Sequence, residues 1–289
     1  MGKAARTKKS RPSGPPPAAY VARPFQGLPG ESDWVALAEI LPAATTRVRL
    51  KADIGGPDGP REVLVCTVLP MAWPALRRAD GAVLVATQGG GHSGDTSRDL
   101  GSAILAALAA QPGTPLTHVP LATSQTPPLQ DLIEPEAPVV SVHDGFDFWV
   151  EGQDLGEDAQ ESLARANDTV LPTEAVPGSP AAYWCLIGNR PHLRVVLGDD
   201  EDEATNALAR LWASGTAGLG DGTRLLGAFR AGGLLIPVWE LPAGTAATDL
   251  VEPLAAWRER YAAAAVDAPL TAQERRAKAG LLNRQITLR

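Results

Sequence analysis

The chain has 289 residues, of which 44% are hydrophobic and 20% charged, and its formal net charge at pH 7 is −7. This composition is typical of a globular protein with a buried core, and the length suits one large domain or two ordinary ones. A membrane-spanning protein is excluded, because no apolar run approaches the ~18 residues that a transmembrane helix needs.

The start of the chain and the cysteines both predict a cytoplasmic protein. The basic residues of Met1–Arg11 are followed by prolines and not by the apolar stretch of a signal peptide. Cys66 and Cys185, the only two cysteines, lie within the apolar runs VLVCTVL and YWCLIG. Such neighbours indicate buried free thiols in a reducing compartment and not a disulfide framework.

Charge is distributed unevenly along the chain. Residues 1–23 carry six basic residues and no acid, and residues 271–289 carry five basic residues and one acid. The body between them, residues 24–270, carries 15 basic and 32 acidic residues, a net charge of −17. A polyanion would therefore be repelled by the body and could be held only by the ends. Residues 1–22 have little to bury and are predicted to form a disordered basic leader.

The first half of the folded part begins at Asp33, which is a plausible helix N-cap. In DWVALAEIL the apolar residues recur at helical spacing, and Pro42 ends the helix. Three strands are expected in TTRVRLKA, EVLVCTVL and AVLVATQ, and a helix in RDLGSAILAALAA. PVVSVHDGFDFWVE then reads as a hairpin that turns near Asp144 and Gly145.

The second half repeats this order of elements. EDAQESLARAND is a helix, and LPTEAVP, AAYWCLIG and HLRVVLG are strands. EDEATNALARLWASG is a helix with acids at its N-terminus, and TRLLGAFRAGGLLIPVWEL is a hairpin with Gly232-Gly233 at its turn. A closing helix is expected over residues 249–265. Trp149 and Trp239 fall in matching hairpin arms, which indicates a shared packing role.

These patterns predict an α+β fold of two tandem related α-β-β-β-α-β-β halves with mainly antiparallel sheets. The expected divisions are residues 1–22 for the disordered leader, 23–152 and 153–266 for the two halves, and 267–289 for a C-terminal basic helix and tail. The order of elements resembles that of the type III secretion chaperones, a fold that binds other proteins.

The stretch GGGHSGDTSRD, residues 89–99, is the most site-like in the sequence. Its glycines free the backbone, and an anion could bind at the start of the next helix with His92, Asp95 and Arg98 as ligands. It lacks the lysine and the spacing of a phosphate-binding loop, however, which favours a flexible connection in which Thr96 or Ser97 caps the helix.

Other patterns argue against metal and hydrolase sites. The acidic run Asp199–Glu203 lacks the ligand order of an EF-hand and favours a solvated helix start. The four histidines are scattered, so that no metal site and no cofactor is expected, and no G-x-S-x-G motif predicts a serine hydrolase. No catalytic residue is therefore assigned.

The C-terminal stretch APLTAQERRAKAGLLNRQITLR predicts a helix capped by Thr271 and Glu274. This helix either docks on the protein with its basic side chains solvated or contacts an acidic partner, such as RNA or another subunit. The candidate partner-binding residues are Arg275, Arg276, Lys278 and Arg284.

Five motifs, RPFQGLPGESDWVALAEILPAAT, VLPMAWPAL, GDTSRDL, LLIPVWELP and LLNRQITLR, together resemble an actinobacterial family of unknown function, some of whose members are labelled as a SecA-type translocase or a topoisomerase. Longer relatives begin with a zinc-binding CPCGSG...CHG module. This chain has no such cysteines before Cys66, so zinc binding and any function attached to that module are not transferred to it.

Three functions follow from these observations. The favoured one is a non-enzymatic protein-binding or chaperone-like scaffold that presents a sheet or a groove between its halves to a protein partner. The second is an RNA- or ribosome-associated factor held weakly through the basic termini. The third is an enzyme that uses the loop around His92, and no membrane contact is expected.

Overall fold

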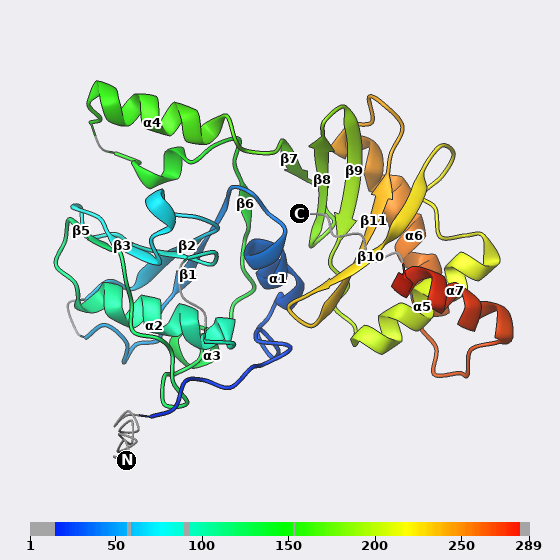
Figure 1. Ribbon diagram of the computed structural model, residues 1–289, viewed down its shortest axis with the longest axis horizontal. Helices are drawn as coiled ribbons and strands as arrows, with labels where there is room; N and C mark the ends of the chain where they lie inside the picture. Colours follow the sequence, from blue (N-terminus) through cyan, green and yellow to red (C-terminus); the bar gives the residue numbers. More distant parts are fainter. Residues whose placement is uncertain (1–14, 57–58, 90–92, 153, 284–289) are drawn as a thin grey trace, which may run out of the picture.

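The computed structural model describes residues 15–56, 59–89, 93–152 and 154–283. Two β-sheets stand on either side of one short helix, α1 (Glu31–Glu39), and further helices cover their other faces (Figure 1). The mixed α+β class is thereby confirmed. Within the described ranges, no helix is long and apolar enough to cross a membrane.

The first sheet has six strands in the order β5-β3-β4-β2-β1-β6. They are β1 (Ala44–Arg49), β2 (Glu62–Cys66), β3 (Ala75–Arg77), β4 (Val83–Ala86), β5 (Thr114–Leu116) and β6 (Ser141–Val142). Strands β2 and β4 run parallel, and the other pairs are antiparallel. The three strands expected before the second helix are present, and β3 is an additional one.

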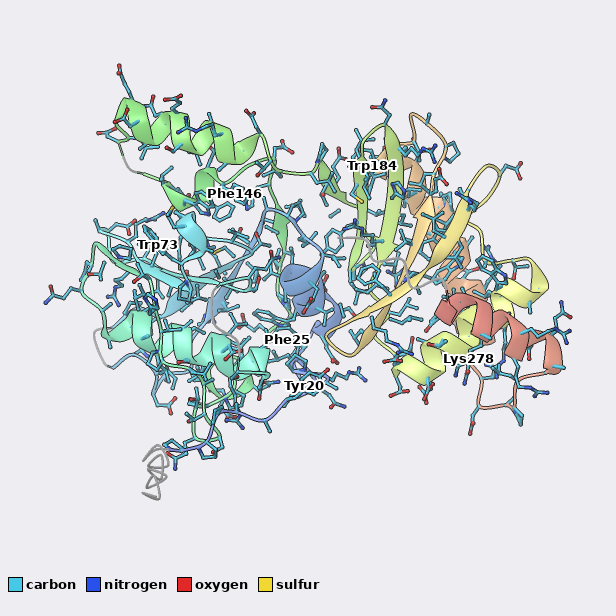
Figure 2. The ribbon with its side chains drawn as sticks, viewed as in Figure 1. Tyr20, Phe25, Trp73, Phe146, Trp184 and Lys278 are labelled. Atoms are coloured by element: carbon cyan, nitrogen blue, oxygen red, sulfur yellow. The ribbon has the colours of Figure 1, made fainter. Side chains whose placement is uncertain are left out.

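Successive side chains of these strands point to opposite faces of the first sheet, and apolar side chains are buried on both faces. Val63, Val65 and Val85 share a core with α1 and with α2 (Thr96–Ala109). Leu64, Cys66 and Leu84 point to the opposite, outer face, where Phe146 and Phe148 pack. The short helix α3 (Leu129–Leu132), two 3-10 turns, η1 (Pro70–Ala72) and η2 (Asp147–Trp149), and helix α4 (Glu157–Asn167) complete this half of the chain. A third 3-10 turn, η3 (Ala247–Leu250), lies after the second sheet. Figure 2 shows Phe146 between the sheet and α4.

The second sheet is antiparallel throughout, in the order β10-β11-β9-β8-β7. Its elements are β7 (Thr173–Ala175), β8 (Ala182–Ile187), β9 (Arg190–Val195), β10 (Arg224–Ala231), β11 (Leu234–Glu240), α5 (Glu201–Ser214), α6 (Val251–Ala264) and α7 (Ala272–Asn283). Trp239 and Leu193 pack with α5 and α6, whereas Tyr183, Leu234 and Ile236 share the core of α1. We call the first sheet with α1–α4 the first lobe, and the second sheet with α5–α7 the second lobe.

Helix α1 is buried on every side because both sheets pack against it. Five consecutive residues, Trp34–Ala38, are at most 7% exposed. A helix that is apolar all round belongs in an interior, whereas the apolar spacing of DWVALAEIL predicted a single buried face. The helix begins earlier than predicted, with Gly30 in the left-handed conformation (φ 67°) as its N-cap and Asp33 in its first turn.

The predicted duplication is not confirmed. The stretch PVVSVHDGFDFWVE forms no hairpin, because Ser141–Val142 pairs with β1 and the expected second arm contains the 3-10 turn η2. The first sheet also contains a parallel crossover, β2 to β4, for which the second sheet has no counterpart in its described strands. Trp149 and Trp239 consequently do not share a position, since Trp149 ends η2 and Trp239 lies in β11.

The described end of the predicted disordered leader is packed against the first lobe. Pro17 forms a β-bridge with Thr123, and Ala18 is 5% exposed and donates its amide to the carbonyl of Ala122 at 2.9 Å. The amide of Val21 donates to the carbonyl of Gly94 at 3.0 Å. Residues 15–22 are thus held by backbone hydrogen bonds, which a composition-based prediction does not detect. Residues 1–14 lie outside the described ranges.

The two thiols are free and buried, as expected, one in each sheet. Cys66 in β2 donates a hydrogen bond to the carbonyl of Val85 at 3.2 Å. Burial raises the pKa of Cys66 strongly, and it also raises the pKa of Cys185 in β8, where the charge of Arg194 opposes the effect. Neither sulfur is therefore an activated nucleophile.

Candidate functional site: a cleft between the lobes

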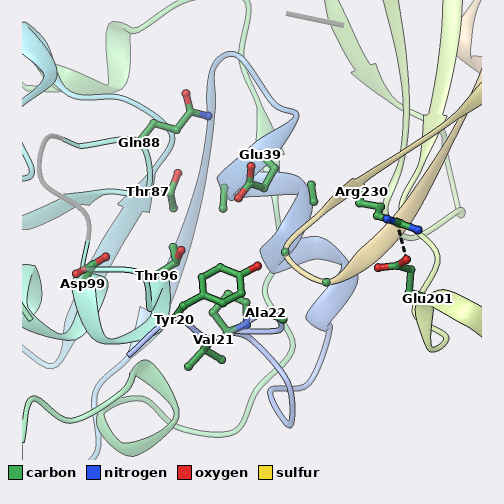
Figure 3. A pocket seen from close by; sticks show the side chains of 16 residues that line it. Tyr20, Val21, Ala22, Glu39, Thr87, Gln88, Thr96, Asp99, Glu201 and Arg230 are labelled. Carbon is green, nitrogen blue, oxygen red and sulfur yellow. Dashed lines mark ion pairs between the residues drawn. The ribbon is translucent and has the colours of Figure 1, made fainter. Parts of the chain in front are cut away.

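A cleft of about 830 Å³ opens between the two lobes. Its walls come from five segments: residues 20–24 before α1, the end of α1, the end of β4 with the start of α2, the start of α5, and the tip of the β10–β11 hairpin (Figure 3). This volume lies within the range of about 300–1,000 Å³ that is usual for ligand sites. The cleft therefore needs both lobes, and no single element forms it.

The N-terminal wall carries the most exposed aromatic ring. Tyr20 is 79% exposed, and Figure 3 shows its ring directed into the cleft. The hydrogen bond between Val21 and Gly94 holds its backbone on the first lobe. Gly94 has a φ of 109°, and an added Cβ there would lie 3.3 Å from the Cα of Tyr20. A side chain at position 94 would thus both strain the turn and push this wall away.

The second lobe contributes the hairpin tip and an ion pair. Nε of Arg230 lies 2.5 Å from a carboxylate oxygen of Glu201 at the start of α5. Gly232 and Gly233 form the turn with φ values of 52° and 77°. An added Cβ at Gly233 would lie 2.6 Å from the carbonyl oxygen of Ala22, so this glycine allows the hairpin to touch the N-terminal wall.

The first-lobe wall is polar and fixed. The hydroxyl of Thr87 donates to the carbonyls of Leu37 and Thr67 at 3.2 and 3.3 Å. Asp99 in α2 accepts hydrogen bonds from the amide of Ser93 at 3.0 and 3.2 Å. The predicted site loop, residues 89–99, therefore borders the cleft through Gly94, Thr96 and Asp99.

Of the predicted ligand residues, His92 lies outside the described ranges. Asp95 and Arg98 do come together, but they bind each other: Asp95 accepts from the amide of Arg98 at 3.2 Å, and its carboxylate also lies 3.2 Å from Nε of Arg98. Asp95 is thereby the cap of α2, a role that the sequence had given to Thr96 or Ser97. A second guanidinium nitrogen of Arg98 donates to the carbonyl of Thr126.

The basic tail residues are divided between docking and solvent. Lys278 donates to Asp202 at 3.1 Å and to Asn206 at 2.9 Å, which fastens α7 to α5. Arg275 and Arg276 are exposed on α7, and Arg284 lies outside the described ranges. One member of the acidic run, Asp202, therefore holds α7, whereas Glu201 pairs with Arg230 and Asp199 accepts a hydrogen bond from Tyr261. No group of three or more His, Cys, Asp or Glu among the described residues is placed to hold a metal ion.

Polar contacts join the two lobes, and the sequence predicted none of them. Arg23 donates to Glu31 at 2.6 and 3.0 Å and, across the lobes, to the carbonyl of Gly198 at 2.9 Å. Asp33 of α1 accepts from the amide of Ala181 at 3.0 Å and from the hydroxyl of Tyr183 at 3.4 Å.

The electrostatics of Asp33 follow from its place between the lobes. Burial raises the pKa of Asp33, although the hydrogen bonds from Ala181 and Tyr183 and the charge of Arg258 lower it. Burial likewise lowers the pKa of Arg258, against the opposing charge of Asp33. The two charges stabilise each other where little water reaches them.

Comparison with known proteins gives a family but no activity. No curated protein and no solved structure matches the chain. A family model does match, over residues 24–289, and its description is "Family of unknown function (DUF5926)". The match begins at the residue after Arg23 and includes both lobes and every segment of the cleft except residues 20–23. The chain is therefore a member of this family of unknown function.

Proposed function

We propose that this protein is a non-enzymatic cytoplasmic binding protein, and that its cleft receives a basic segment of a partner protein. The observation that carries the proposal is the cleft itself, whose walls come from both lobes and from the segment before α1. A concave site between rigid bodies is the usual place for a ligand.

The charges around the cleft favour a basic occupant. Its described lining includes three carboxylates, Glu39, Asp99 and Glu201, and one guanidinium, Arg230, which is already paired with Glu201. The surrounding body, residues 24–270, has a net charge of −17. Such a field attracts lysine and arginine side chains and repels acidic ones.

Tyr20 supplies the second part of the recognition. Tyr20 is 79% exposed, and its ring is directed into the cleft, where an aromatic face can hold a cation. An exposed tyrosine in a cleft whose lining has three carboxylates and one guanidinium is thus suited to a lysine or arginine side chain.

The described lining of the cleft contains carboxylates and hydroxyl groups but no His, Cys, Ser or Lys. In the proposal the carboxylates act as charge partners of a bound cation, and no catalytic role is assigned to them. Both thiols are buried in the sheets.

Short labelled peptides test this proposal by fluorescence anisotropy. One peptide carries a central Lys-Arg pair in a Gly-Ser background, and its matched partner carries Glu-Glu instead. We expect the basic peptide to bind and the acidic peptide not to bind. Glu39→Gln should weaken binding about fivefold and Tyr20→Ser about threefold, as expected for the loss of one charge contact or one cation–π contact of ~1 kcal/mol or less.

Two surface substitutions serve as controls. Glu259→Gln removes an exposed charge on α6, and Val139→Ser alters a residue that is 82% exposed; neither position lines the cleft. Both variants should bind the basic peptide as the original protein does. The proposal is wrong if acidic and basic peptides bind alike, or if the cleft variants behave like the controls.

A further inference from the structure

The outer face of the first sheet carries two arginines that the strand register brings to the same side. Arg47 in β1 is paired with Leu64 in β2, which in turn is paired with Leu84 in β4. Arg78 follows β3 and donates its amide to the carbonyl of Ala82, one row along. Since side chains alternate between the faces of a sheet, both arginines project outward with Leu64 and Leu84.

A second cavity, of about 450 Å³, lies over these rows. Leu64 and Leu84 belong to its lining, together with Arg47, Arg61, Arg78 and Glu151. It shares no lining residue with the cleft between the lobes. The cavity therefore combines an apolar strand surface with three guanidinium groups.

The guanidinium group of Arg78 is fixed by Asp80, and one of its nitrogens makes no hydrogen bond to a described residue. Its Nε and Nη2 donate to the carboxylate of Asp80 at 2.9 and 2.6 Å, which lowers the pKa of Asp80. The side chain is only 10% exposed, and its buried Nη1 has no hydrogen-bond acceptor among the described residues. A buried donor without an acceptor is costly, so a group that accepts this hydrogen bond would bind favourably.

The space between the arginines is occupied by a poorly fitting carboxylate. One oxygen of Glu151 lies 3.7 Å from Nη2 of Arg47 and 4.0 Å from Nη1 of Arg78. Both contacts are short enough to be ion pairs, but both are too long to be hydrogen bonds. Glu151 is also 60% exposed, so that it can leave at little cost.

We propose that this cavity is a binding site for a small ligand with a phosphate or carboxylate group, and that Glu151 is its internal competitor. The anionic group would lie between Arg47 and Arg78 and accept the hydrogen bonds that Glu151 leaves unmade. Guanidinium groups bind both phosphate and carboxylate through paired N–H donors. Two further acids, Glu62 and Asp80, lie at the cavity, and Arg78 already neutralises Asp80.

Calorimetric titration with inorganic phosphate, and separately with acetate, tests the site at an ionic strength held constant with potassium chloride. Glu151→Gln removes the competitor, and we expect it to bind at least one of the two anions about fivefold more tightly than the original protein. Arg47→Gln should abolish saturable binding. The anion that binds more tightly identifies the ligand group as phosphate or carboxylate.

Arg49→Gln is the matched control, because Arg49 lies two residues further along β1, forms a similar ion pair with Glu136 at 3.5 Å and does not line the cavity. It should bind the anion as the original protein does. The proposal is overturned if Glu151→Gln shows no saturable binding of either anion, or if Arg47→Gln and Arg49→Gln bind alike. Peptide binding in the cleft is unaffected by either result.

Discussion

At the tip of the β10–β11 hairpin, two glycines determine how closely the second lobe approaches the segment before α1. Gly233 has a φ of 77°, and an added Cβ would lie 2.6 Å from the carbonyl oxygen of Ala22 and 2.9 Å from Cβ of Arg23. Gly244 has a similar φ of 83° but no atom within 4 Å of an added Cβ. Both glycines therefore have a left-handed backbone, but only Gly233 also has a close neighbour, so that a comparison of the two distinguishes the cost of backbone strain from the cost of a steric clash.

Alanine at these two positions should therefore have different effects. Gly244→Ala should cost about 1–2 kcal/mol, the usual penalty for a left-handed alanine. Gly233→Ala should cost at least about 1 kcal/mol more, because Ala22 must also move. The free energies of unfolding in urea measure both. Equal costs would mean that the hairpin does not press on the N-terminal segment.

Residue-level prediction from the sequence succeeded where the signal was local. The Gly232-Gly233 turn was expected from a glycine pair between two strand patterns, and the structure has the turn there. The contact of Gly233 with Ala22 could not be predicted, because it joins residues far apart in the chain. The same holds for the cleft. The stretch GGGHSGDTSRD was predicted as a site and forms part of one wall, but Tyr20 and Arg230 of the other walls lie in no distinctive sequence pattern.

Among the elements, α1 shows why a helix can be predicted correctly and its environment wrongly. Its apolar spacing predicted one buried face, whereas the structure buries it between two sheets. Asp33, expected as a cap, is used instead to bind Ala181 and Tyr183 of the second lobe. Helices α2, α4, α5 and α6 were predicted well, because their periodicity or caps are local signals.

The raised pKa of Asp33 makes this contact between the lobes pH-dependent. The folded protein holds the Asp33 proton more tightly than the unfolded chain does, so the free energy of unfolding falls as pH rises from the unfolded pKa to the folded one. Asp33→Asn keeps an acceptor but removes this titration. Its stability relative to the original protein should therefore increase across that window, as measured by urea unfolding at a series of pH values.

Tyr183→Phe provides a second variant for the same contact. It removes one of the two hydrogen bonds that lower the pKa of Asp33 in the folded protein, so the upper end of the window of falling stability should move to higher pH, while the lower end, set by the unfolded chain, stays in place. A stability difference between Asp33→Asn and the original protein that stays constant with pH would contradict the assignment.

At the scale of the whole molecule, the two lobes share one of their cores. Tyr183, Leu234 and Ile236 of the second sheet pack in the same cluster as Trp34 and Leu37 of α1. The division at residues 152 and 153 was predicted from repeated order of elements, and order alone does not reveal which faces meet. The domain boundary between residues 152 and 153 therefore stays a prediction, and the residues of one apolar core come from both sides of it.

A shared core should make unfolding a single event. We expect one cooperative transition in urea, with coincident curves from far-ultraviolet circular dichroism and from tryptophan fluorescence. Buried tryptophans report on both lobes, through Trp34 in α1 and Trp239 and Trp257 in the second lobe. Two separated transitions would show that the lobes are independent domains.

The placement of one buried thiol in each sheet has a practical consequence for following such motions. Cys66 lies in the first sheet and Cys185 in the second, and burial raises the pKa of each. An alkylating reagent reacts with the thiolate, so it reaches either sulfur only when the surrounding strands separate. The rate at which each cysteine is alkylated therefore measures how often the sheet around it opens, and no cysteine has to be introduced for the experiment.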